Sequence, residues 1–225
     1  MEVLMEKAKK SYFTAKNVTY LAVLLALVIV LQVWGGSIKI GATSLSFVLV
    51  PIVLGGVLLG IGAGAILGFA FGFIVLMYGV TGADPFTALL FSAHPVITSF
   101  LCLIKGTAAG AVSGLLYKLI SVKNKYVAVF VASAVAPVVN TGLFIIGALF
   151  MGDFITQTFV PDGETLMYFL VIGCAGINFL VEFAINIILS PAIFTVNNVL
   201  EKQLRRSSHG YSAKKEHKTQ KTDTE

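Results

Sequence analysis

The fold of this chain is decided by the stretch IGAGAILGFAFGFIVLMYGV at residues 61–80. It contains no charged residue and is long enough to cross a bilayer as a helix, which takes roughly 20 apolar residues. It also lacks the alternation of apolar and polar residues that a barrel strand requires. The stretch therefore predicts a membrane-spanning α-helix.

Similar apolar stretches lie on both sides of this helix. We predict spans at residues 18–34, 45–59, 61–80, 96–119, 126–151 and 166–199. The last is longer than one crossing, so its end beyond Pro191 is expected to run on into the cytoplasm. The second is the least distinct, because residues 58–62 form no polar turn and Pro51 can kink or shorten the helix. The predicted fold is an all-α, six-helix membrane bundle.

The composition agrees with a membrane protein. Of 225 residues, 57% are hydrophobic and only 12% charged, whereas soluble domains carry about 25% charged residues. We expect one membrane domain at 18–200, a basic leader at 1–17 that is retained as part of the protein, and a basic tail at 201–225 whose composition predicts disorder. The net charge of +5 comes from the two ends and one loop, which predicts contact with lipid head groups and no nucleic acid.

The basic residues predict the orientation. They fall in three groups, before the first span, between the fourth and fifth, and after the sixth: Lys7, Lys9, Lys10 and Lys16; Lys118, Lys123 and Lys125; Lys202, Arg205, Arg206, Lys214, Lys215, Lys218 and Lys221. Six spans place all three groups on one side. Because positive loops stay in the cytoplasm, both termini are predicted to be cytoplasmic.

Small residues recur every four positions in several spans: Gly56, Gly60, Gly64, Gly68 and Gly72; Gly106, Gly110 and Gly114; Ala22 and Ala26. This spacing lets membrane helices approach closely. For the glycines we favour packing inside the chain. For the alanine pair on the first helix, packing inside the chain and contact with a partner are both open.

Two charged residues lie inside predicted spans, Lys105 in the fourth and Glu182 in the sixth. Asn178 and Asn186 flank Glu182 at one helical turn on each side, so the three form one polar stripe. A charge at membrane depth costs about 3 kcal/mol or more, so such residues face the bundle interior. Two explanations are open: an internal ion pair between Lys105 and Glu182, or a site for a small polar or anionic ligand.

Other candidate ligand residues lie in the fifth span and the outer loops. Asn140 and Thr141 follow Pro137, where the missing backbone donor can loosen a helix. Trp34 ends the first span and is a candidate for either interfacial anchoring or ligand contact. The connection at 78–95 is long enough for a lid and contains His94, for which an exposed loop position is the simpler explanation.

The motifs of several enzyme classes do not occur in the sequence. It contains no phosphate-binding loop with a Lys-Ser/Thr ending and no His-Glu-x-x-His motif, and its three histidines lie outside the spans. One acidic residue inside the spans does not make a catalytic carboxylate pair. We predict that the chain is not an enzyme and needs no cofactor or metal.

At this point the sequence resembles the substrate-binding S components of energy-coupling factor (ECF) vitamin transporters. The resemblance rests on the six-span organisation, on Ala22-x-x-x-Ala26, on the glycine-rich block at 50–72 and on the motif Pro-Val-Val-Asn-Thr at 137–141. It covers residue 18 to about residue 200. Relatives often have Arg where this chain has Lys105. The lysine keeps the positive charge but cannot bind a carboxylate through two parallel N–H donors, as an arginine can.

The resemblance implies a function that composition alone does not. Such proteins bind one water-soluble vitamin near the outer face and dock on a transmembrane coupling subunit that carries two cytoplasmic ATPases; the S component then topples in the plasma membrane to deliver the vitamin. Ala22 and Ala26 would be docking residues, and Asn140, Asn178 and Glu182 pocket residues. The similarity is greater to the pantothenate and folate branches than to the riboflavin branch, and we favour pantothenate, with folate or riboflavin as alternatives.

Two other classes of function remain open from the residues. The chain could be a self-contained secondary transporter in which Glu182 carries a proton. It could also be a membrane scaffold that binds no ligand, in which an ion pair between Lys105 and Glu182 stabilises the bundle.

Overall fold

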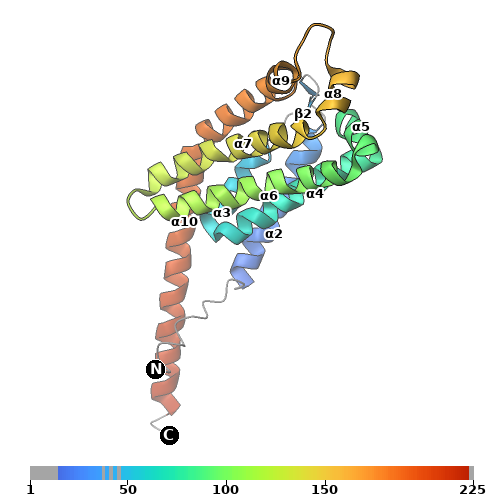
Figure 1. Cartoon of the computed structure of the whole chain (residues 1–225). Coiled ribbons are helices and arrows are strands. Elements are labelled where there is room, and N and C mark those ends of the chain that lie inside the picture. Colours follow the sequence, from blue (N-terminus) through green and yellow to red (C-terminus); the bar gives the residue numbers. More distant parts are fainter. Residues whose placement is uncertain (1–14, 37–38, 41–42, 45–46, 223–225) are drawn as a thin grey trace, which may run out of the picture.

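The computed structural model describes residues 15–36, 39–40, 43–44 and 47–222, with side chains described over 16–36 and 47–202. Within that part the chain is almost entirely helical (Figure 1). Among the described residues, five segments are long and apolar enough to cross a membrane: Lys16–Gly35, Ile61–Thr81, Pro95–Ile120, Lys125–Leu149 and Leu166–Lys202. The prediction of an all-α membrane protein is confirmed to this extent.

The elements follow one another with short connections. They are α2 (Ala15–Gly35), β1 (Lys39–Ile40), β2 (Thr43–Ser44), α3 (Leu49–Leu59), α4 (Ile61–Thr81), α5 (Pro85–Ala93), α6 (Pro95–Ile120), α7 (Lys125–Leu149), α8 (Gly152–Phe159), α9 (Leu166–Tyr168), the π-helix η2 (Phe169–Gly176) and α10 (Ile177–Thr222). The two short strands pair antiparallel between α2 and α3, with Lys39 opposite Ser44.

Helix α3 is shorter than the span predicted at 45–59, of which residues 45–46 lie outside the described part. It has 11 residues, which at 1.5 Å per residue is about 17 Å, well short of the roughly 30 Å hydrocarbon core. Pro51 is tolerated because it lies in the first turn. Gly60 ends the helix with φ of 98°, which favours glycine, and α4 begins at the next residue. A sixth crossing at this place stays a prediction.

The glycine stripe packs α4 against α6. A Cβ added to Gly68 would overlap the carbonyl oxygen of Gly106, and one added to Gly64 would overlap that of Gly110. The two backbones are therefore in direct contact, which only small residues permit. Packing inside the chain, predicted for most of these glycines, is confirmed except at Gly60, where nothing lies within 4 Å of an added Cβ.

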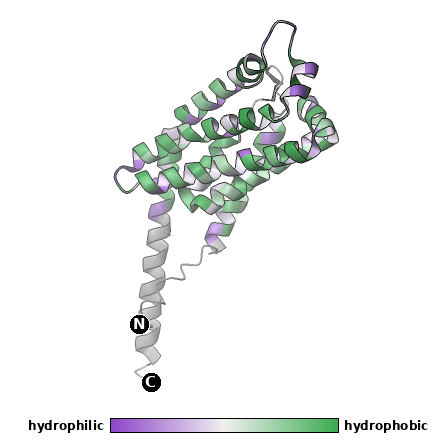
Figure 2. Ribbon diagram, viewed as in Figure 1, coloured by the Kyte–Doolittle hydropathy of each residue, from purple (hydrophilic) through white to green (hydrophobic). Residues whose placement is uncertain are grey.

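The helices of the bundle consist mostly of hydrophobic residues (Figure 2). Large hydrophobic side chains stay exposed along the helices, among them Val30 at 62%, Leu180 at 63% and Ile188 at 73%. Ala22 and Ala26 on α2 are exposed as well. An apolar exterior of this extent suits contact with lipid, whereas on a soluble protein it would cause aggregation.

The two ends of the bundle differ. The start of α2, the α6–α7 connection and the C-terminal part of α10 lie toward one end, and α5 and α8 lie toward the other (Figure 1). The described members of the three basic groups therefore lie toward one end. Which end faces the cytoplasm stays a prediction from charge.

Helix α10 extends beyond the bundle and changes direction along its length (Figure 1). Pro191 lies inside it, and a proline removes one backbone hydrogen bond. The chain is helical to Thr222, in a tail that its composition predicted to be disordered, and the Lys-, Glu-, Gln- and Arg-rich sequence there favours helix once a preceding turn is formed. The predicted leader at 1–17 lies outside the described residues except for its last three positions, and 223–225 lie outside them too.

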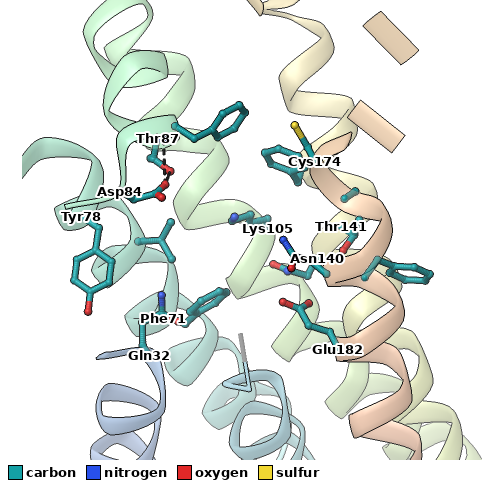
Figure 3. A pocket seen from close by; sticks show the side chains of 16 residues that line it. Gln32, Phe71, Tyr78, Asp84, Thr87, Lys105, Asn140, Thr141, Cys174 and Glu182 are labelled. Atoms are coloured by element: carbon teal, nitrogen blue, oxygen red, sulfur yellow. Dashed lines mark hydrogen bonds between the residues drawn. The ribbon is translucent and has the colours of Figure 1, made fainter. Parts of the chain in front are cut away.

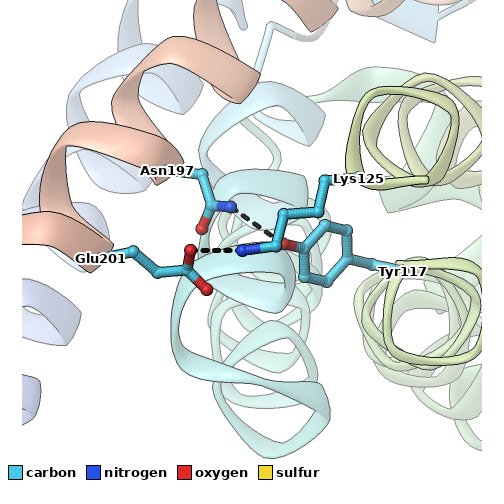
Figure 4. A network of polar contacts seen from close by, with 4 residues as sticks. All are labelled: Tyr117, Lys125, Asn197 and Glu201. Atoms are coloured by element: carbon cyan, nitrogen blue, oxygen red, sulfur yellow. Dashed lines mark hydrogen bonds and ion pairs between the residues drawn. The ribbon is translucent and has the colours of Figure 1, made fainter. Parts of the chain in front are cut away.

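A polar network holds α10 to α6 and α7 at the end nearest the extension (Figure 4). Asn197 Nδ2 donates a hydrogen bond of 2.8 Å to Tyr117 Oη, and Lys125 forms an ion pair with Glu201. Asn197 is 2% exposed, so its hydrogen bond replaces water that the site excludes.

Candidate functional site

A cavity of about 110 Å³ lies inside the bundle, toward the α5 end (Figure 3). At roughly 10–15 Å³ per water, it has room for on the order of ten water-sized groups. Seven elements contribute side chains: Gln32 from α2; Phe71, Val75 and Tyr78 from α4; Asp84, Phe86 and Thr87 around the start of α5; Lys105 from α6; Asn140, Thr141 and Phe144 from α7; Cys174 and Ala175 from η2; Asn178, Phe179 and Glu182 from α10.

Lys105 supplies the cationic group of this cavity. Its Nζ lies 5.4 Å from the centroid of the Phe144 ring, a distance at which the negative face of an aromatic ring attracts a cation. Its backbone is fixed, because the next residue, Gly106, packs against the backbone of α4. The ammonium thus projects into the cavity from the tightest helix contact of the bundle (Figure 3).

Glu182 supplies a buried carboxyl group from α10. It is 6% exposed, and Asn178, one turn before it, also lines the cavity. Across the described side chains the only ion pair within 4 Å joins Lys125 and Glu201. Lys105 and Glu182 therefore share the cavity without a direct ion pair.

Helix α7 places Asn140 and Thr141 beside them. Asn140 is 7% exposed, and its Oδ1 has no hydrogen-bond partner in the described structure. A buried acceptor without a partner costs about 1–3 kcal/mol. The loosening predicted at Pro137 is not seen, since α7 continues as a helix from Lys125 to Leu149.

Two of the predicted ligand residues do not reach the cavity. Asn186 is 1% exposed and lies one turn beyond Glu182, where its Nδ2 donates a hydrogen bond of 2.8 Å to the Glu182 carbonyl oxygen. Trp34 is 59% exposed, and its ring centroid lies 5.5 Å from that of Phe47. The other five, Lys105, Asn140, Thr141, Asn178 and Glu182, all line the cavity.

The start of α5 forms part of the cavity wall, which the sequence did not predict. Asp84 caps this helix, accepting hydrogen bonds from the backbone N–H of Thr87 at 3.1 Å and from its hydroxyl. The signal was present in the sequence as Asp84-Pro85, a cap followed by proline at the first helical position. The connection predicted as a lid is therefore largely helical. His94, which ends α5, makes an edge contact with the Phe154 ring and does not line the cavity.

Aromatic side chains close the cavity toward α8. The Phe86 ring centroid lies 6.2 Å from that of Phe144 and 5.0 Å from that of Phe159, which itself stacks on Phe169 at 6.3 Å. These contacts join α5, α7, α8 and η2. The cavity is thus polar at Lys105 and Glu182 and apolar at this end, a combination typical of small-molecule sites.

The π-helix η2 lies where α9 leads into α10, and it carries Cys174 and Ala175 on the cavity wall. A π-helix has a wider turn than an α-helix and occurs often at functional sites, because the extra residue shifts the side chains that follow. Here it precedes Asn178 and Glu182 directly and so sets where they point.

Comparison with known families agrees with this arrangement. Residues 16–194 match the family described as ECF transporter, substrate-specific component. The chain belongs to this family. The comparison with curated proteins returned no match. As a substrate-specific component, the chain is a multi-pass membrane protein of a family that binds small-molecule substrates, works with coupling and ATPase modules and is not a family of enzymes.

Proposed function

We propose that this S component captures one small water-soluble vitamin, with pantothenate as the favoured ligand. The observation that carries the proposal is the convergence of Lys105, Asn140 and Glu182, from three helices, on one cavity with no ion pair between the two charges. An ammonium without a carboxylate partner is available to an anionic group, and Asn140 Oδ1 is available to a hydroxyl or an amide N–H.

The lining of the cavity supports the choice among vitamins. One ammonium, several amide groups and phenyl rings suit a ligand with one carboxylate, one amide and two hydroxyls, which describes pantothenate. Phe71, Phe144 and Phe179 would pack against the apolar part of the ligand.

Delivery would use a partner. The exposed Ala22 and Ala26 on α2 offer a flat strip where a transmembrane coupling subunit with two ATPases could pack closely. In this proposal the chain spans the plasma membrane six times with both termini in the cytoplasm, and it topples to release the vitamin inward.

Calorimetric titration of the purified full-length chain with pantothenate, folate, riboflavin, thiamine and biotin tests the capture role, with thermal shift as a second readout. We expect one saturable ligand, pantothenate. Binding of folate or riboflavin instead would keep the capture role and change the ligand. No response to any vitamin in either readout would contradict the proposal and favour a scaffold.

Uptake experiments separate the proposal from a proton-coupled carrier. In vesicles containing the complete transporter, uptake of the vitamin should require ATP and persist when an uncoupler collapses the proton gradient. Uptake by the S component alone that the uncoupler abolishes would favour the carrier and give Glu182 the role of proton site.

A further inference from the structure

Gln32, near the end of α2, is a buried polar residue that the sequence analysis did not single out. It is 5% exposed, lines the cavity, and its Oε1 has no hydrogen-bond partner in the described part of the chain. Figure 3 shows it pointing into the cavity across from Asn140 and Glu182. A glutamine kept for the fold would be expected to pair this oxygen, since nearly all buried acceptors in folded proteins are paired.

The surrounding structure fixes where Gln32 points. Leu24 and Val28 lie two turns and one turn earlier on the same face of α2 and are only 6% and 0% exposed. Gln32 therefore continues the inward-facing side of the helix and is the polar residue on it. Its carbonyl oxygen accepts a hydrogen bond of 2.8 Å from the N–H of Gly36. A Cβ on Gly36 would lie 3.1 Å from the Tyr78 ring, so the glycine lets the end of α2 pack closely on α4.

We propose that Gln32 is a ligand-recognising residue. Its Oε1 accepts a hydrogen bond from a hydroxyl or amide N–H of the vitamin, while Lys105 holds the anionic group from another wall of the cavity. The inference rests on the proposed capture function and narrows the ligand to an anion that also carries hydrogen-bond donors. A bare carboxylate or an apolar molecule would leave the Gln32 and Asn140 oxygens unpaired.

This assignment makes α2 part of the binding site. The same helix carries Ala22 and Ala26 on its exposed side. A ligand that bonds to Gln32 would therefore restrain the helix that is proposed to dock on the coupling subunit. Empty and loaded forms would then differ in how firmly this helix is held.

The test uses the full chain in detergent, with pantothenate as the probe, and compares the wild type with Gln32→Met, Gln32→Leu and the control Val30→Leu. Both Gln32 variants keep the side-chain bulk but remove the acceptor. We expect them to weaken binding about 10-fold or more, in line with the loss of one hydrogen bond at roughly 1.4 kcal/mol per factor of ten. Val30, 62% exposed on the lipid side of α2, should tolerate leucine with unchanged affinity.

The melting temperature of the ligand-free protein separates recognition from support of the fold. Because Gln32 Oε1 has no partner in the fold, both variants should melt at or above the wild-type temperature. Affinity within twofold of the wild type would overturn the inference and leave the capture function standing. A lower melting temperature in both variants would also overturn it, because Gln32 would then support the fold. If the wild type binds none of the vitamins, the capture function fails, and this inference with it.

Discussion

At the scale of single residues, the informative feature is that Lys105 and Glu182 share a cavity without touching. An internal ion pair would explain two charges at membrane depth with no need of a ligand. Both residues line the cavity, and no ion pair with an N–O distance of 4 Å or less joins them. This favours the second explanation, in which a ligand completes the polar contacts. In the protein without ligand, the contact with the Phe144 ring stabilises the charge of Lys105.

Replacing Lys105 tests this directly. Lys105→Met keeps much of the length and removes the charge, so binding of pantothenate should weaken by roughly 1.5–3 kcal/mol, the value of a hydrogen bond to a charged group. Calorimetric titration measures the change, with Lys118→Met, an exposed lysine in the last turn of the same helix, as the control. Wild-type affinity in Lys105→Met would make this residue structural.

Most of the cavity residues on α6, α7 and α10 were predictable because charged and amide groups are conspicuous in apolar spans. Gln32 was missed because it stands near the end of a predicted span, where a polar residue carries little information. Asn186 was included because helical spacing places it on the stripe of Glu182, but spacing cannot show where a cavity ends along a stripe.

At the scale of elements, the contact of α4 with α6 depends on glycine at some positions and not at others. Gly68 and Gly62 lie on the same helix, but a Cβ on Gly68 would overlap the Gly106 carbonyl, while nothing lies within 4 Å of one on Gly62. Gly68→Ala should therefore lower the melting temperature in detergent. Gly62→Ala should leave it unchanged or raise it, because alanine favours helix by about 1 kcal/mol. Equal effects of the two substitutions would contradict the packing argument.

The network at the start of the α10 extension allows a second comparison (Figure 4). Tyr117→Phe leaves the buried Asn197 amide unpaired and should cost about 1–3 kcal/mol. Lys125→Met breaks an ion pair whose side chains are 40% and 38% exposed, and such pairs contribute about 0–1 kcal/mol. Thermal unfolding of the two variants should rank them in that order, and the reverse ranking would give the ion pair the larger role.

The long helices α2, α4, α6 and α7 were predictable to within a few residues, because continuous apolar stretches have few alternatives in a membrane. The short elements were not. Helix α3 was predicted as a full span because its apolar sequence continues into α4, and only the backbone conformation at Gly60 separates them. Helices α5 and α8 lie in connections, where amphipathic turns of eight or nine residues give a weak sequence signal.

At the scale of the whole molecule, the exposed small residues of α2 make a prediction about assembly. Ala22→Trp should block vitamin uptake by the complete transporter and leave binding to the purified chain intact, because bulk prevents close helix approach. Leu27→Trp is the control, since Leu27 is also exposed but lies on another side of the same helix. Normal uptake with Ala22→Trp, or an equal loss of uptake in both variants, would contradict the assignment of Ala22 as a docking residue.

The backbone contact between α4 and α6 also has a kinetic consequence. Lys105 is bonded to Gly106, which lies in that contact, so the residue proposed to bind the ligand's charge is held by a closely packed backbone. Adjustment to an entering vitamin must then fall on α2, α5, α8 and η2, whose contacts are made by side chains. Amide hydrogen exchange should accordingly slow in these outer elements when the vitamin binds. At the contact of α4 with α6, exchange should already be slow in the protein without ligand.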